Sequence, residues 1–133
     1  MQTWIDIPKN SDFTLQNLPY GIFQTGERTP RAGVAIGEYI IDLHVTQQAQ
    51  LLPRELPMGI FDHPSLNPFI ALGKPAGRAL RQKLQALLSE GNPALASQQD
   101  RLLVPMEKAT MLLPVQVGDY TDFYSSLEHA VNV

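Results

Sequence analysis

Proline and glycine occur so often in this chain that long helices and strands are not expected over most of its length. Eleven prolines and nine glycines are spread over 133 residues. Proline disrupts the interior of helices and sheets, and glycine favours turns. The chain is therefore expected to fold from short elements joined by many turns. Strands do not alternate with helices along the sequence, so a doubly wound parallel sheet is not expected.

The clearest strand pattern lies in residues 31–43. Two runs rich in β-branched and aromatic residues, 32–36 and 39–43, flank a two-residue link that begins with Gly37. This arrangement predicts a β-hairpin. Further strands are expected at 101–105 and at 109–116. Together these segments predict a mainly β domain with short helices, arranged as a small, partly open β-barrel or roll.

One longer helix is predicted at residues 75–91. Pro75 suits the first helical turn, apolar residues recur at a spacing of three to four, and Gly91 supplies a stop signal. The apolar stripe consists of Ala76, Leu80, Leu84, Leu87 and Leu88. Shorter helices are expected at residues 43–52 and 65–73.

Charge and residue content narrow the classes of partner. The net charge is −3 and no cluster of lysine and arginine is present, which argues against nucleic acid binding. The chain has no cysteine, which excludes disulfides and thiolate metal sites and is compatible with a reducing compartment. The first residues lack the pattern of a signal peptide, and no apolar run approaches the roughly 20 residues of a membrane span, so neither is expected. We therefore expect a cytoplasmic protein that binds neither nucleic acid nor a membrane.

The segment richest in reactive side chains is residues 118–133, GDYTDFYSSLEHAVNV. Ser125 and Glu128 match a capping box, so a helix is expected to begin there. Asp122 is a hard oxygen ligand suited to Ca²⁺ or Mg²⁺, and the imidazole of His129 suits a general base. One carboxylate is too few to hold such a cation. These residue types therefore fit either part of an active site or a capped, solvent-facing helix. By contrast, the isolated His44 and His63 are expected to have structural or surface roles.

The same sixteen residues resemble the domain junction of the fumarylacetoacetase (fumarylacetoacetate hydrolase) family. Four other segments resemble the N-terminal region of that family in the same order. They are SDFTLQNLPYGIF (11–23), RAGVAIGEYIIDL (31–43), LNPFIALG (66–73) and ATMLLP (109–114). The resemblance runs from about residue 11 to residue 133 and is weakest in residues 44–64 and 89–108.

The resemblance implies a fold and a reaction. Residues 1–115 would form an N-terminal domain that is a small SH3-like β-barrel. Residues 116–133 would be the junction and the start of a larger catalytic domain that this chain lacks. In the family, the enzyme is a homodimer that uses a bound Ca²⁺ or Mg²⁺. It hydrolyses a carbon–carbon bond in fumarylacetoacetate to give fumarate and acetoacetate, the last step of tyrosine and phenylalanine breakdown.

The resemblance also assigns roles to three residues. Asp122 stands at the position of a metal-ligating aspartate, Tyr124 at that of a tyrosine contacting the substrate, and His129 at that of the histidine that activates water. The family glutamate that orients this histidine belongs to the catalytic domain and has no counterpart here. The isolated chain is therefore expected to be inactive, as the first part of a longer protein.

Two other functions remain open at the level of sequence. The chain could be a free-standing SH3-like binding or assembly module without catalysis, because this kind of barrel serves many functions. It could also belong to a related acylpyruvate-type hydrolase of the same superfamily. The joint presence of Asp122, Tyr124 and His129 favours the hydrolase over the docking module. The segments SDF (11–13), NLPYG (17–21) and DYTDFYSS (119–126) favour fumarylacetoacetase proper.

Overall fold

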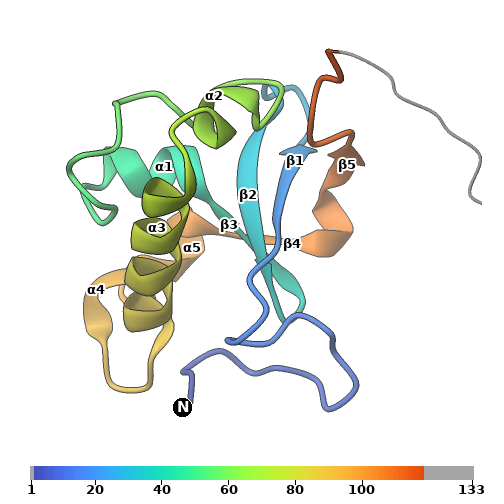
Figure 1. The fold of residues 1–133 in the computed structure, drawn as a ribbon. Coiled ribbons are helices and arrows are strands. Elements are labelled where there is room, and N and C mark those ends of the chain that lie inside the picture. The colour runs from blue at the N-terminus through green and yellow to red at the C-terminus, as the bar shows by residue number, and fades with distance from the viewer. Residues whose placement is uncertain (1, 119–133) are drawn as a thin grey trace, which may run out of the picture.

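The computed structural model describes residues 2–118 (Figure 1). The strands are β1 (Tyr20–Gln24), β2 (Arg31–Ile36), β3 (Tyr39–Asp42), β4 (Leu103–Pro105) and β5 (Thr110–Leu112). The helices are α1 (Leu43–Gln48), α2 (Asn67–Ile70), α3 (Lys74–Leu88), α4 (Pro93–Ala96), α5 (Gln99–Leu102) and the 3₁₀ helix η1 (Met106–Lys108).

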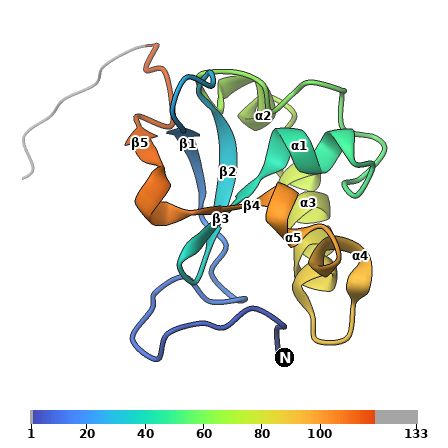
Figure 2. The ribbon, with the colours of Figure 1, turned by 180° about the vertical axis from the view of Figure 1, so that it is seen from behind.

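The strands form one curled antiparallel sheet in the order β4-β3-β2-β1-β5. The predicted hairpin is present as β2 and β3, and Gly37 in its turn has a φ of 57°, which glycine adopts without steric cost. From β4 at one edge, the chain passes through η1 to β5 at the opposite edge (Figure 2). The result is a half-barrel, which confirms the predicted fold class, mainly β with short helices on a small barrel.

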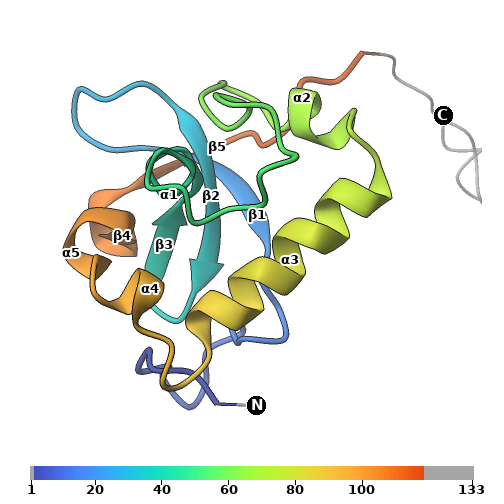
Figure 3. The same ribbon diagram turned by 90° about the vertical axis from the view of Figure 1, so that its left-hand side faces the viewer.

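The main core lies between the sheet and α3. Side chains of successive strand residues point to opposite faces of a sheet, and alternate residues such as Ile22, Val34 and Ile41 are fully buried. They pack in one cluster with Leu80 and Leu84 of α3, which runs along one side of the sheet (Figure 3). Each such side chain contributes about 1.5–3 kcal/mol of burial free energy. Residues 2–118 therefore contain a hydrophobic core of their own.

Helix α1 ends at Gln48 and does not continue to residue 52 as predicted. Gln50 has a φ of 62°, in the left-handed region. Its N–H donates to the carbonyl of Gln47 at 2.9 Å, and the N–H of Leu51 donates to the carbonyl of Thr46 at 3.3 Å. These two bonds make a Schellman motif, which usually places glycine at the left-handed position. Glutamine occupies that position here, so no glycine marks the end of the helix in the sequence.

Helix α3 also ends early, at Leu88. The N-terminal segment takes up the carbonyl groups at its end: Trp4 Nε1 donates to the carbonyl of Leu87 at 3.0 Å, and Thr3 Oγ1 donates to that of Leu88. Ser89 is extended and pairs with Thr3 in an isolated bridge. A segment more than 80 residues away in sequence therefore caps this helix.

The last two predicted strands are shorter than expected. Residues 101–105 divide between α5 and β4, and only Thr110–Leu112 of the segment 109–116 is a strand. Helix α4 was not predicted, although Asn92 caps it by accepting a hydrogen bond from the N–H of Ala94 at 3.0 Å. No helix within residues 2–118 has both the length and the apolar character needed to cross a membrane.

Candidate functional site

The three residues predicted to act in catalysis lie outside the described part of the chain. Asp122, Tyr124 and His129 follow Gly118, the last described residue, and so does the predicted capping box. Their relative placement and their roles therefore stay predictions. The boundary between a domain of residues 1–115 and a junction of residues 116–133 also stays a prediction. The structure does show how the chain approaches this segment.

Residues 114–116 are fixed against the start of α2. The N–H of Leu66 donates to the carbonyl of Pro114 at 2.7 Å. The side-chain amide of Asn67 makes two bonds to one residue: its Nδ2 donates to the carbonyl of Gln116 at 2.8 Å, and its Oδ1 accepts from the N–H of Gln116 at 3.0 Å. This two-way exchange is the pattern that two antiparallel strand residues make with their backbones. Gln116, six residues before Asp122, is thereby held in position.

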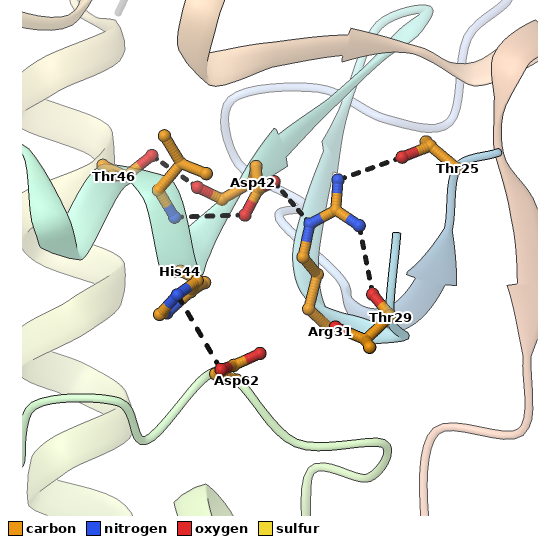
Figure 4. Close-up of polar contacts among 8 residues, drawn as sticks. Thr25, Thr29, Arg31, Asp42, His44, Thr46 and Asp62 are labelled. Atoms are coloured by element: carbon orange, nitrogen blue, oxygen red, sulfur yellow. Dashed lines mark hydrogen bonds and ion pairs between the residues drawn. The ribbon is translucent and has the colours of Figure 1, made fainter. Parts of the chain in front are cut away.

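A buried ion pair lies at the centre of the polar contacts in Figure 4. Arg31 Nε donates to Asp42 Oδ2 at 2.6 Å, and the two side chains are 4% and 1% exposed. The guanidinium also donates to Thr25 Oγ1 at 3.1 Å and to the carbonyl of Thr29 at 3.2 Å. Its Cζ lies 4.4 Å from the centre of the Phe23 ring, a cation–π distance.

Asp42 also joins the hairpin to α1. Its Oδ1 accepts a hydrogen bond from the N–H of Val45 at 3.2 Å as the N-cap of the helix, and its carbonyl accepts one from Thr46 Oγ1 at 2.7 Å. The partners of Arg31 and Asp42 all belong to the fold, which makes the pair structural. Sequence reasoning missed it, although an aspartate directly before a predicted helix is a recognisable N-cap signal.

A histidine and an aspartate face each other beside this pair. His44 Nε2 lies 3.9 Å from Asp62 Oδ2, and Asp62 is half exposed (Figure 4). The distance exceeds that of a hydrogen bond, so the carboxylate does not orient the imidazole as a catalytic dyad requires. His63, the next residue along the chain, is exposed. The positions of both histidines agree with the structural or surface roles expected for them.

Metal ligands are not grouped within residues 2–118. No cluster of three or more histidine, aspartate or glutamate side chains in this range could hold a metal ion. Of the predicted site residues, only Asp122 was assigned to a metal, and it falls outside this range. The described residues therefore provide no donor set against which a bound cation could be fitted.

The sheet carries a further hollow, here called the glycine groove, on the face opposite α3. Its volume is about 270 Å³. The lining includes Gly21, Phe23, Gly33, Ile40, Met106 and Met111. No carboxylate, imidazole or amine lines it among the described residues. Tyr20 also lines the groove, and its hydroxyl donates to the carbonyl of Gly77 in α3 at 3.3 Å. The lining as a whole therefore suits an apolar group.

Comparison with known proteins identifies similar sequences over nearly the whole chain. The family model described as "Fumarylacetoacetase N-terminal" matches residues 16–114. A fumarylacetoacetase of Caenorhabditis elegans is 44% identical over 141 aligned residues, which cover 100% of this chain and 33% of that protein. The fumarylacetoacetases of Rattus norvegicus and Homo sapiens are 43% and 41% identical, over 98% of this chain and 32% of each protein. The chain thus spans about a third of the length of these curated relatives.

Proposed function

Because this chain belongs to the fumarylacetoacetase family and matches its N-terminal part, we propose that it is the N-terminal portion of a fumarylacetoacetase. The proposed reaction is the hydrolysis of a carbon–carbon bond in fumarylacetoacetate, which yields fumarate and acetoacetate. The observation that carries this proposal is the 41–44% identity to fumarylacetoacetases of three animals over 98–100% of the chain.

The proposed catalytic roles fall on the segment that follows the described domain. His129 would take a proton from water, Tyr124 would contact the substrate, and Asp122 would be one ligand of a divalent cation. The other ligands, and the carboxylate that orients His129, would come from chain beyond residue 133. Support for these roles comes from the resemblance of residues 118–133 to the family's domain junction.

The reaction places defined demands on these side chains. Hydroxide must form at neutral pH, and an imidazole with a pKa near 6.5 is suited to accept the proton of water. The hydroxide adds to a carbonyl carbon of the β-diketone, and the adjacent carbon–carbon bond then breaks. The bonding electron pair leaves with the acetoacetate part as an enolate, which takes up a proton. A bound Ca²⁺ or Mg²⁺ would supply positive charge that stabilises this enolate.

In this proposal the described domain supports catalysis without entering the reaction. The bonds from Leu66 and Asn67 to Pro114 and Gln116 fix the point from which the catalytic segment departs. Precise placement of reacting groups is worth orders of magnitude in rate. We propose that the isolated chain is inactive. A role in tyrosine and phenylalanine breakdown, a homodimer and a cytoplasmic location also stay predictions.

The role of His129 is tested by a matched pair of histidine variants in the full-length polypeptide. His129→Asn is expected to lower the rate of acetoacetate release by about 10²–10⁴-fold, the usual contribution of a general base. His63→Asn, which replaces an exposed histidine of the described domain, is the control and is expected to retain the wild-type rate. Circular dichroism would establish that both variants are folded. A His129→Asn enzyme that works as fast as the control would refute the assignment.

A further inference from the structure

Two paired glycines lie in the lining of the glycine groove. Gly21 of β1 and Gly33 of β2 are directly opposite each other. A Cβ added to Gly33 would lie 2.5 Å from Ile40 Cγ2 and 2.9 Å from the Phe23 ring, which are distances that real Cβ atoms do not reach. The side chains of Phe23 and Ile40 therefore lie directly over bare backbone, and they form apolar walls for the groove.

An exposed apolar run continues from this groove along the chain. Met111 lines the groove and is itself 59% exposed. Every second residue after it is also apolar and exposed: Leu113 is 84%, Val115 40% and Val117 70% exposed. Large exposed apolar side chains that follow one another in the chain are unusual on a soluble domain and mark an interaction site. The groove and the run share Met111 and are together called the groove surface; the run follows the chain from β5 toward Gly118.

We propose that the groove surface binds the catalytic domain of the same polypeptide. This inference rests on the proposed function, because only a longer fumarylacetoacetase has such a domain. About two thirds of the length of each relative lies outside the region matched by this chain. The exposed run is the stretch that leads into that remainder.

Hydrogen bonds from the start of α2 favour binding of the catalytic domain over binding of another partner. Leu66 and Asn67 hold Pro114 and Gln116 in place, so the polypeptide that follows starts from a fixed point on the groove surface. A domain tethered at such a point has a high effective concentration at the adjoining surface. The absence of charged side chains from the described lining of the groove favours an apolar side chain of that domain as the inserted group.

Two exposed methionines allow a footprinting test with an internal control. Met111 belongs to the groove surface, whereas Met58 is 73% exposed in the loop between α1 and α2 and does not line the groove. Low doses of hydrogen peroxide oxidise accessible methionine to the sulfoxide, which mass spectrometry quantifies for each residue. The 133-residue chain and the full-length polypeptide would be compared under the same conditions.

In the 133-residue chain, both methionines are expected to oxidise at similar rates. In the full-length polypeptide, Met111 is expected to oxidise about tenfold more slowly, since burial limits access to the thioether, while Met58 is unchanged. Equal rates for Met111 in the two proteins would overturn the proposal. So would protection of Met111 in the 133-residue chain that disappears on dilution, because a second copy would then be the occupant.

The footprint is independent of the proposed catalytic activity. Protection of Met111 in a full-length polypeptide that does not hydrolyse fumarylacetoacetate would support the docking proposal and refute the proposed function. Hydrolysis by a full-length polypeptide whose Met111 oxidises as fast as Met58 would do the reverse. A native polypeptide that ends at residue 133 would overturn the docking proposal, because no occupant would remain.

Discussion

Replacing Arg31 by methionine tests the account of the fold most severely. The substitution keeps much of the apolar stem of the side chain but leaves the Asp42 carboxylate buried without its counter-ion. Both side chains are at most 4% exposed, so solvent screening does not weaken the effect. Removing one partner of a buried pair costs about 3–5 kcal/mol. The lost cation–π contact with Phe23 adds about 1 kcal/mol.

Three further variants separate the contributions. Asp42→Asn can still cap α1, because asparagine is a good N-cap residue, but it removes the counter-ion of Arg31. The double variant Arg31→Met/Asp42→Asn removes both charges and is expected to be less destabilised than the sum of the single changes by about 0.5–3 kcal/mol. Arg28→Met, at an exposed position of the connection between β1 and β2, is the control and is expected to change stability by less than about 0.5 kcal/mol.

The assay is urea unfolding of the 133-residue chain, followed by circular dichroism, with the free energy obtained by linear extrapolation. A cost of 3–5 kcal/mol is a large share of the roughly 5–15 kcal/mol that stabilises a typical domain. Arg31→Met is therefore expected to be unfolded or close to unfolding at room temperature. An Arg31→Met variant as stable as Arg28→Met, or purely additive losses in the double variant, would refute the stabilising role of the ion pair.

Two other predictions follow from contacts within residues 2–118. Asn67→Ala removes both hydrogen bonds to Gln116. It is expected to speed hydrogen exchange of the Gln116 amide by about tenfold, which corresponds to the loss of a local hydrogen bond of about 1.4 kcal/mol. Core amides serve as the control, and unchanged exchange at Gln116 would contradict the proposed anchor. Burial raises the pKa of Tyr20 above its usual 10.0, against an opposing effect of Arg81. The buried, neutral phenol of Tyr20 therefore contributes its full stabilisation below pH 10, and this stabilisation is lost as the pH rises through the raised pKa of the folded state. The free energy of unfolding is expected to fall less steeply above pH 10 in Tyr20→Phe than in the wild type or in Tyr39→Phe, and equal slopes in all three would contradict the assignment.

Local patterns in the sequence predicted the hairpin and α3. Gly37 between two β-rich runs specifies a tight turn, and the recurrence of leucine from Leu80 to Leu88 specifies one buried helix face. Both signals are contained within a dozen or so residues. The structure confirms both elements. The core face of the sheet and the apolar stripe of α3 pack against each other, so each is buried by the other.

Features that depend on distant segments could not be read from the sequence. The end of α3 is set by Thr3 and Trp4, which take up its last carbonyl groups. The positions of β4 and β5 at opposite edges depend on how far the sheet curls. The anchor between Asn67 and Gln116 joins residues that are 49 positions apart. No local pattern encodes such pairings, because each arises only when two remote segments meet.

The functional residues show the same difference between what local sequence predicts and what only the folded structure reveals. The resemblance of residues 118–133 to the family's junction singled out Asp122, Tyr124 and His129, which lie outside the described residues. Sequence reasoning assigned no function to the glycine groove, because glycine in a strand indicates missing bulk without showing what fills the space. The opposition of Gly21 and Gly33 becomes evident only once the strand register is known.

The proposed function makes this chain the N-terminal portion of a hydrolase of fumarylacetoacetate. It is tested by the release of acetoacetate from fumarylacetoacetate by the native polypeptide, isolated from its source cells with an antibody against residues 2–118. We expect a native polypeptide well above 14.8 kDa that hydrolyses the substrate, and no hydrolysis by the isolated 133-residue chain. A native polypeptide of 14.8 kDa, or a longer one without hydrolysis, would contradict the proposed function.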